Sequence, residues 1–254
     1  MGNLDLFDID LVGGRKKIAV LPCSVIEIGE QPSIRREDGG HDSKSSRAEY
    51  SHFPAEVGAI CFQLYLSDKC NIFDPFAGWG ERAADAREHW KSYTGFDINP
   101  LAIARAKEVF GVENTLADSR INPIPNFDGL ITCPPYWNLE KYSDSGLDGL
   151  PTFDKFCDEL GYVFRRCYDA AERGAIFCVM TGDWRDGGKY FDLTYRVQNL
   201  FDKFGASVVD QVVLSRLRVS KVKVMIPQAI RLGYTVKVHE TLSVFKKTEE
   251  ISLS

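Results

Sequence analysis

The chain has 254 residues, enough for one sizeable α/β domain, and its 44% hydrophobic and 26% charged residues are ordinary for a globular protein. No apolar run is long enough to cross a bilayer and the N-terminal residues lack the apolar core of a secretory signal, so we expect a cytoplasmic protein without a membrane anchor. The seven cysteines form no CxxC pair and the four histidines show no ligand spacing, which argues against a metal site.

The net charge of −5 argues against a protein that coats nucleic acid, because affinity for phosphate requires Lys and Arg. Basic residues are nevertheless concentrated in the segment 216–237, which has no acidic residue. This segment is either a solvated loop or hairpin, or a surface for a polyanion. Its basic residues are Arg216, Arg218, Lys221, Lys223, Arg231 and Lys237.

Residues 1–51 read as an N-terminal extension, in which 18–29 alternates like a strand and 31–51 is a polar, mobile loop. Residues 52–254 read as one domain in which helices and strands alternate, which predicts a mostly parallel seven-stranded sheet with helices on both faces. We expect helices over 54–66, 81–90, 100–110, 153–172 and 191–204. We expect strands over 71–75, 92–97, 114–117, 129–132, 175–181, 206–214 and 239–246.

A glycine-containing turn follows the first strand of this domain and precedes a helix. Its sequence is Phe73-Asp74-Pro75-Phe76-Ala77-Gly78-Trp79-Gly80. Ligands of open α/β sheets bind at the carboxyl ends of the strands, and glycine lets the backbone approach them closely. By itself such a turn is weak evidence for a nucleotide site.

Acidic residues follow the next two strands. Asp97 ends the second strand about 20 positions after the glycine turn, where a carboxylate can accept both hydroxyls of a ribose. The alternative is that Asp97 caps the following helix. Asp118 follows the third strand, where it either meets an adenine amino group or is a turn residue.

The turn and the segment Gly95-Phe96-Asp97-Ile98-Asn99-Pro100 together resemble the cofactor motifs of Rossmann-like S-adenosylmethionine-dependent methyltransferases. A dinucleotide-binding dehydrogenase fits less well because the turn lacks GxGxxG. The segment that begins with His52 resembles the one that closes over the methionine end of the cofactor in amino-methyltransferases. The resemblance implies S-adenosylmethionine as cofactor, bound by His52, Pro54, Asp74, Phe76, Ala77, Gly78, Gly80, Asp97, Ile98 and Asp118.

The sequence Thr132-Cys133-Pro134-Pro135-Tyr136-Trp137 follows the fourth strand. Two prolines hold the backbone extended and present a carbonyl and the flanking side chains rigidly. An exocyclic base amine is a poor nucleophile, and acceptors placed against its two N–H bonds stabilise the charge that develops during methyl transfer. The alternative is a stiff turn with packed aromatic residues.

This motif resembles the (Asp/Asn/Ser)-Pro-Pro-(Tyr/Phe/Trp) motif of DNA N6-adenine and N4-cytosine methyltransferases. The resemblance implies a catalytic set of Cys133, Pro134, Pro135 and Tyr136, with Tyr136 stacked on a base that is flipped out of the duplex. The chain departs from the motif at Cys133, a weaker acceptor than Ser, Asn or Asp. A nucleophilic cysteine of the C5-methylation type fits less well, because those families place their cysteine after a proline.

The likeness extends over roughly 52–247. It includes an Asn138-Leu139-Glu140-Lys141-Tyr142-Ser143 run like that of phage-type DNA methylases, the segment around Asp183, and the start of the last strand at His239 and Glu240. Asp183 either lines the base pocket or caps a loop, whereas His239 and Glu240 are expected to orient the strand.

In this chain the glycine motif precedes the Pro-Pro motif, whereas many Ser-Pro-Pro-Tyr enzymes have the reverse order. The resemblance therefore implies a compact, permuted form of the family, without a large target-recognition domain. The segment 215–238 is therefore the expected DNA contact, through Arg216, Arg218, Lys221 and Lys223, and 35–47 is a second candidate. A partner protein that delivers the target is also consistent with so small a surface.

These observations predict an enzyme that methylates the exocyclic amine of cytosine or adenine in double-stranded DNA, of the kind found in phages and restriction–modification systems. One alternative is an RNA or other amine methyltransferase on the same fold. Another is a degenerate, non-catalytic module that binds the cofactor or DNA. Fold alone does not choose between them.

Overall fold

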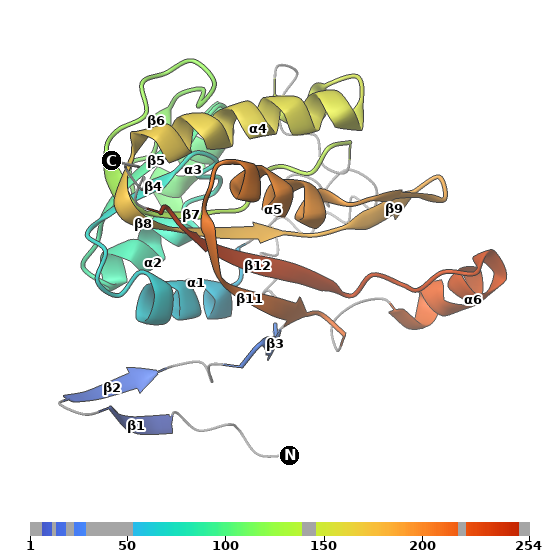
Figure 1. Cartoon of the computed structure of the whole chain (residues 1–254), viewed down its shortest axis with the longest axis horizontal. Coiled ribbons are helices and arrows are strands. Elements are labelled where there is room, and N and C mark those ends of the chain that lie inside the picture. The colour runs from blue at the N-terminus through green and yellow to red at the C-terminus, as the bar shows by residue number, and fades with distance from the viewer. Residues whose placement is uncertain are drawn as a thin grey trace, which may run out of the picture.

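The domain is organised around an eight-stranded sheet with the strand order β3-β11-β12-β8-β7-β4-β5-β6 (Figure 1). The computed structural model describes residues 7–11, 14–18, 23–28, 53–138, 146–217 and 222–248. The strands are β3 (Val25–Glu27), β4 (Asn71–Asp74), β5 (Ser92–Asp97), β6 (Thr115–Leu116), β7 (Phe127–Thr132), β8 (Ala171–Thr181), β11 (Ser207–Ser215) and β12 (His239–Lys246).

The five strands from β8 to β6 are mutually parallel, while β12 runs antiparallel to both β8 and β11. The expectation of seven strands is wrong by one, because β3 pairs in parallel with β11 and adds an edge strand. β3 lies within the segment 18–29 that was expected to alternate like a strand, but its pairing with the sheet was not predicted. Two small hairpins lie outside the sheet: β1 (Phe7–Leu11) with β2 (Gly14–Ile18), and β9 (Trp184–Asp186) with β10 (Lys189–Phe191).

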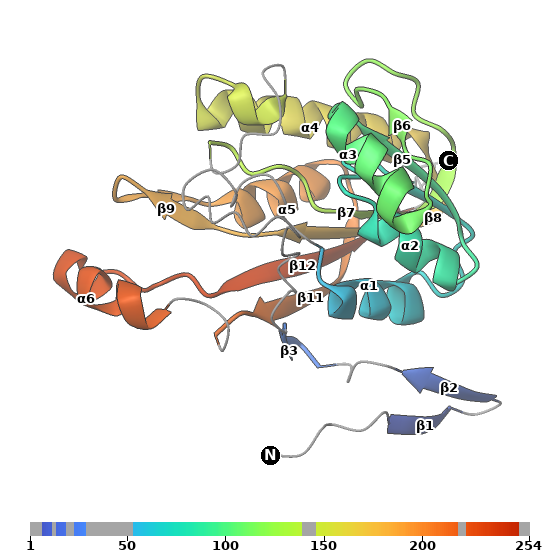
Figure 2. The ribbon, with the colours of Figure 1, turned by 180° about the vertical axis from the view of Figure 1, so that it is seen from behind.

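Successive side chains of a strand point to opposite faces of the sheet, so the largely buried central strands present apolar side chains to both faces. Helices cover both faces for this reason. Phe177 and Val179 of β8 belong to one apolar core, with α4 and α5, whereas Cys178 and Met180 belong to the other, with α1. Figure 2 shows the second face from behind, with α1 and α2 in front of the strands. The helices are α1 (Ala55–Ile60), η1 (Cys61–Tyr65), α2 (Glu81–Glu88), α3 (Pro100–Arg105), η2 (Ala106–Phe110), η3 (Leu147–Gly149), α4 (Phe153–Ala170), α5 (Leu193–Lys203) and α6 (Val222–Leu232).

The basic segment was expected to be a surface loop, and that expectation is wrong. Residues 222–232 form α6, with Pro227 inside the helix. Val224 and Ile230 of this helix are 78% and 76% exposed. No helix of the described ranges is long and apolar enough to cross a membrane.

Candidate active site

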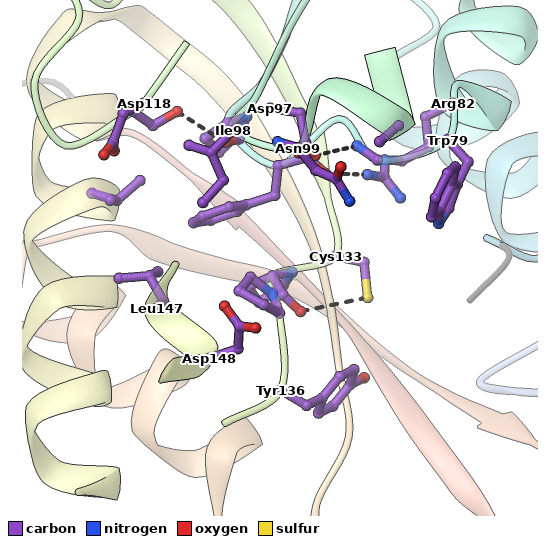
Figure 3. Close-up of a pocket in the computed structure, with 18 of the residues that line it drawn as sticks. Trp79, Arg82, Asp97, Ile98, Asn99, Asp118, Cys133, Tyr136, Leu147 and Asp148 are labelled. Atoms are coloured by element: carbon purple, nitrogen blue, oxygen red, sulfur yellow. Dashed lines mark hydrogen bonds between the residues drawn. The ribbon is translucent and has the colours of Figure 1, made fainter. Parts of the chain in front are cut away.

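A pocket of about 1000 Å³, including its open mouth, lies at the carboxyl ends of β4, β5 and β7 (Figure 3). This is the edge at which open α/β sheets bind ligands. Two sets of predicted residues meet in it, one from the glycine turn and the following acids and one from the Pro-Pro motif. They are Phe76, Gly78, Asp97, Ile98, Asp118, Cys133, Pro134, Pro135 and Tyr136.

Asp74 holds the framework beneath the pocket instead of lining it. Its carboxylate is fully buried and accepts hydrogen bonds from Arg82 Nε at 2.5 Å, Tyr93 Oη at 2.8 Å and Thr132 Oγ1 at 2.6 Å. These partners come from α2, β5 and β7, so one carboxylate ties three elements to β4. Burial would lower the pKa of Arg82, but the Asp74 charge outweighs burial and raises it. A buried pair of this kind is costly to break.

The glycine turn is shaped by the same arginine. Arg82 Nη2 donates to the Phe76 carbonyl at 2.5 Å, and its guanidinium lies 4.9 Å from the centre of the Phe53 ring. Gly80 has a φ of 102°, and a Cβ there would come within 2.8 Å of Ala106 Cβ. Only glycine fits this position, which brings the start of α2 against η2.

Asp97 faces the pocket and organises its backbone. Its Oδ2 accepts from Gly78 N and its Oδ1 from Asn99 N, each at 2.8 Å. The helix cap is Asn99, whose Oδ1 accepts from Leu101 N at 2.9 Å, so Asp97 is not the capping residue of α3. Burial raises the pKa of Asp97, and the two backbone hydrogen bonds oppose that rise.

Asp118 lies on the same side of the pocket as Asp97 and pairs with Arg120 at 2.7 Å. Partial burial would raise the pKa of Asp118, but the hydrogen bonds from Arg120 outweigh it and lower the pKa below its usual value. The neighbouring Ser119 Oγ donates to the Pro75 carbonyl at 2.9 Å, which joins this loop to the glycine turn. Asp118 therefore presents a charged acceptor at a fixed place.

The Pro-Pro motif continues from β7 along the other side of the pocket. The Cys133 thiol lies 4.0 Å from the Pro134 carbonyl oxygen, as the dashed line in Figure 3 marks. The two groups expected to face the target amine are thus adjacent. Both line the cavity that Asp97 and Asp118 also line.

Tyr136 is held from two sides. Its hydroxyl donates to Glu240 Oε1 at 3.0 Å, and its ring meets Trp184 edge-on at 5.7 Å between centroids. Glu240 Oε2 in turn accepts from Arg216 Nη2 at 2.6 Å. The expected DNA contact Arg216 thus pairs with a residue that contacts the motif, and Glu240 positions Tyr136 as well as belonging to the last strand.

Other predicted residues lie outside this pocket or outside the described residues. Pro54, Ala77 and Gly80 adjoin the pocket without lining it. Asp183 accepts from Tyr190 Oη at 2.6 Å and from Thr194 N at 2.9 Å, as a residue that shapes a loop does. Lys223 lies in α6, and its side chain is not described. His52, Arg218, Lys221 and the segment 35–47 fall outside the described residues.

Several lining residues were not predicted from the sequence, among them Phe53, Trp79, Arg82, Arg120 and Asp148. Asp148 is buried in η3, and Figure 3 shows it between Leu147 and Tyr136. No local pattern marks Asp148, because η3 reaches the motif only through the fold. Within the described residues, no group of three or more His, Cys, Asp or Glu side chains is arranged to hold a metal ion.

Comparison with solved structures shows the fold of this domain. N-methyltransferase NodS from Bradyrhizobium japonicum WM9, in complex with S-adenosyl-L-homocysteine, superposes with a TM-score of 0.52 and 14% identity over 82% of this chain and 94% of that chain. A SAM-dependent methyltransferase from Methanosarcina mazei gives 0.51 and 14% over 74% and 97%. TrmN from Thermus thermophilus gives 0.50 and 15% over 76% of this chain and 48% of that chain.

These likenesses confirm the predicted fold: a Rossmann-like methyltransferase fold with a mostly parallel sheet. The part of TrmN matched by this chain is about half of that protein's length. No family model and no curated protein matches the sequence.

Proposed function

We propose that this chain transfers a methyl group from S-adenosylmethionine to the exocyclic amino group of cytosine (N4) or adenine (N6) in DNA. One observation carries the proposal: five of the predicted cofactor residues and the four residues of the Pro-Pro motif line one pocket. Asp97 and Asp118 lie on one side of it, and Cys133 to Tyr136 lie on the other. A methyl donor and an acceptor amine bound in such a pocket meet between the two sets.

On the cofactor side, each polar group has a specific proposed task. Asp97 would accept the ribose hydroxyls, and Asp118 would accept from the adenine amino group. The Gly78 backbone, held by Asp97, leaves room for close approach of the ligand. The cofactor supplies an electrophilic methyl group on a positively charged sulfur. Of the remaining predicted residues, Pro54, Ala77 and Gly80 are sequence neighbours of residues that line this half of the pocket.

On the acceptor side, the Pro134 carbonyl and the Cys133 sulfur would face the two N–H bonds of the target amine. Localising the nitrogen lone pair lets a C–N bond form as the C–S bond breaks, with the bonding electrons leaving on sulfur. The methylated amine would then release one proton to solvent. The products are S-adenosylhomocysteine and a methylated base. Tyr136, fixed by Glu240 and Trp184, would stack against the base.

A degenerate, non-catalytic module is the second candidate, and a specific observation favours it: Cys133 stands where the related motif has a stronger acceptor. In that case the cofactor would bind, but no methyl group would be transferred. An RNA methyltransferase is the third candidate, because the Pro-Pro motif would contact the amine of the target base more than the nucleic-acid chain that carries it. Transfer assays separate all three.

The test is incubation of the full chain with radiolabelled S-adenosylmethionine and, in parallel, unmethylated duplex DNA, total RNA or no polymer. Label in DNA supports the proposal. Label in RNA alone supports an RNA methyltransferase instead. Cofactor binding without label in either polymer supports the degenerate module.

A further inference from the structure

Two projections extend past the carboxyl edge of the sheet, beyond the pocket. The β9–β10 hairpin follows the carboxyl end of β8, and α6 precedes the start of the antiparallel strand β12. Figures 1 and 2 both show the hairpin and α6 at the same end of the domain. Gly187 and Gly188 have φ values of 55° and 81°, which give the hairpin its tight turn.

Ring–cation contacts join the two projections into one surface. The Arg185 guanidinium lies 4.9 Å from the Tyr190 ring of its own hairpin and 4.8 Å from the Tyr234 ring that follows α6. Lys237, which follows α6, places its Nζ 4.7 Å from the centre of the Tyr190 ring on the hairpin. We call the surface formed by Arg185, Lys189, Tyr190, Tyr234 and Lys237 the basic–aromatic surface.

The charge of this surface contrasts with the rest of the chain. Arg185, Lys189 and Tyr190 are exposed, and Tyr234 and Lys237 are partly exposed, in a protein whose net charge is −5. The nearby acids are Asp183, which accepts two hydrogen bonds, Glu240, which pairs with Arg216, Asp192, which pairs with Arg196, and the exposed Asp186. Cations interleaved with aromatic rings suit a strand of nucleic acid, since cations meet phosphates and rings meet bases.

The surface is connected to the pocket through Tyr136. The Tyr136 ring contacts Trp184, which is the first residue of the hairpin, and its hydroxyl contacts Glu240, near the start of β12. A base held against Tyr136 therefore has its neighbouring nucleotides at the roots of both projections.

We propose that the basic–aromatic surface holds the DNA on either side of the target base. This proposal rests on the proposed function and adds to it a contact surface that includes the β9–β10 hairpin. Lys189 and Lys237 would contact phosphates, and Tyr190 and Tyr234 would lie against the flanking sugar and base faces.

The test is fluorescence anisotropy of a labelled, unmethylated DNA duplex with the full chain and S-adenosylhomocysteine, between about 50 and 200 mM salt. The variant is Lys189→Gln with Lys237→Gln. The matched control is Lys203→Gln with Lys246→Gln, which removes two exposed charges from the opposite edge of the sheet, at the end of α5 and of β12. Circular dichroism and sedimentation verify the fold and the oligomeric state of each protein.

Loss of two phosphate contacts is expected to reduce the slope of log K against log salt by about 1.8 and to weaken binding roughly tenfold, with the control unchanged. An unchanged slope in the Lys189/Lys237 variant overturns the proposal while leaving the methyltransferase assignment intact. Conversion of a dimer to a monomer by the Lys189/Lys237 substitutions also overturns it. If the unaltered chain neither binds nor methylates DNA, the proposed function itself fails.

Discussion

The Tyr136 hydroxyl donates a hydrogen bond to Glu240 Oε1 at 3.0 Å and so joins the Pro-Pro motif to the start of β12, 104 residues later. Glu240 is also paired with Arg216, so one carboxylate fixes both the motif and the first residue after β11. If Tyr136 holds the target base, Glu240 acts as a positioning residue through it. The next predictions follow from this arrangement.

Replacing Tyr136 separates transfer from cofactor binding. Tyr136→Phe keeps the ring but loses the hydroxyl, and we expect kcat to fall roughly 10- to 100-fold, the worth of one hydrogen bond to a charged group. Tyr136→Ala removes the ring and is expected to abolish transfer. S-adenosylhomocysteine affinity, measured by calorimetry, should stay unchanged in both. Glu240→Gln retains an acceptor and should lie nearer the unaltered protein than Glu240→Ala. Full transfer by Tyr136→Ala would remove Tyr136 from the catalytic set.

Asp97→Ala should weaken cofactor binding first. The carboxylate that would bind the ribose also fixes Gly78, so we expect roughly 10- to 100-fold lower affinity for S-adenosylhomocysteine, as for loss of a charged hydrogen bond. Asp202→Ala, an exposed acid on α5, is the matched control and should bind normally. Unchanged affinity in Asp97→Ala would show that another group binds the ribose.

Asp74 should prove to be a structural residue. Asp74→Asn leaves the Arg82 charge buried with a weaker partner, and breaking such a pair costs about 3–5 kcal/mol. Urea unfolding should show this loss, and Arg82→Met in the same protein should restore part of it. A stable Asp74→Asn protein that had lost only cofactor binding would contradict this interpretation.

Asp85 should make the stability depend on pH. It packs so closely on α1 that a Cβ on Gly58 would lie 2.0 Å from its Oδ2, and burial, with the nearby Glu88 charge, raises the pKa of Asp85 to about 7. The folded protein thus holds this proton more tightly than the unfolded chain, where the pKa is about 3.9. The free energy of unfolding therefore falls as pH rises from about 4 to about 7, and this contribution is level above that.

Asp85→Asn removes this pH-dependent contribution to the free energy of unfolding. It should stabilise the protein at about pH 8 by about 1–3 kcal/mol, after allowance for partial exposure, and should flatten the pH dependence. Urea unfolding at about pH 5 and pH 8 measures both effects. Equal pH dependence in the two proteins would show that Asp85 ionises normally in the fold.

Variants of Cys133 test how much its side chain contributes, beside the Pro134 carbonyl, to the contact with the target amine. Cys133→Ser supplies a stronger acceptor, and we expect kcat to rise, whereas Cys133→Ala should lower it if the sulfur takes part. Both should bind the cofactor normally. Equal kcat in all three proteins would assign the amine contact to the Pro134 carbonyl alone.

The regular core was predictable because its pattern is local. The strand over 92–97 and the strand over 239–246 have the predicted bounds, since each starts at an exposed residue and contains a short run of consecutive buried residues. The predicted helices over 54–66 and 100–110 each continue from an α-helix into a π-helical turn, which apolar spacing does not distinguish. The short edge strand β3 depends on pairing with β11, 188 residues away at Glu27 and Ser215.

Part of the site was also predictable from local sequence patterns. Gly78, Asp97 and Pro134 follow strand ends, and parallel strands bring their carboxyl ends together. The place of Asp148 in the pocket and the Glu240 contact with Tyr136 arise only when separate segments fold against each other. The β9–β10 hairpin, in contrast, carries a readable signal in Gly187-Gly188 between two aromatic-containing runs. Helix α6 was missed because Pro227 lies inside it, and proline in a helix interior removes a hydrogen bond and favours a break.

The most direct measurement is nucleoside mass spectrometry of DNA after incubation with the chain and S-adenosylmethionine carrying a deuterated methyl group. The account predicts the heavy methyl on N4 of cytosine or N6 of adenine, and its absence when the chain carries Tyr136→Ala. Heavy methyl on C5 of cytosine, or label that persists in the Tyr136→Ala sample, would contradict transfer to an exocyclic amine by the Pro-Pro motif.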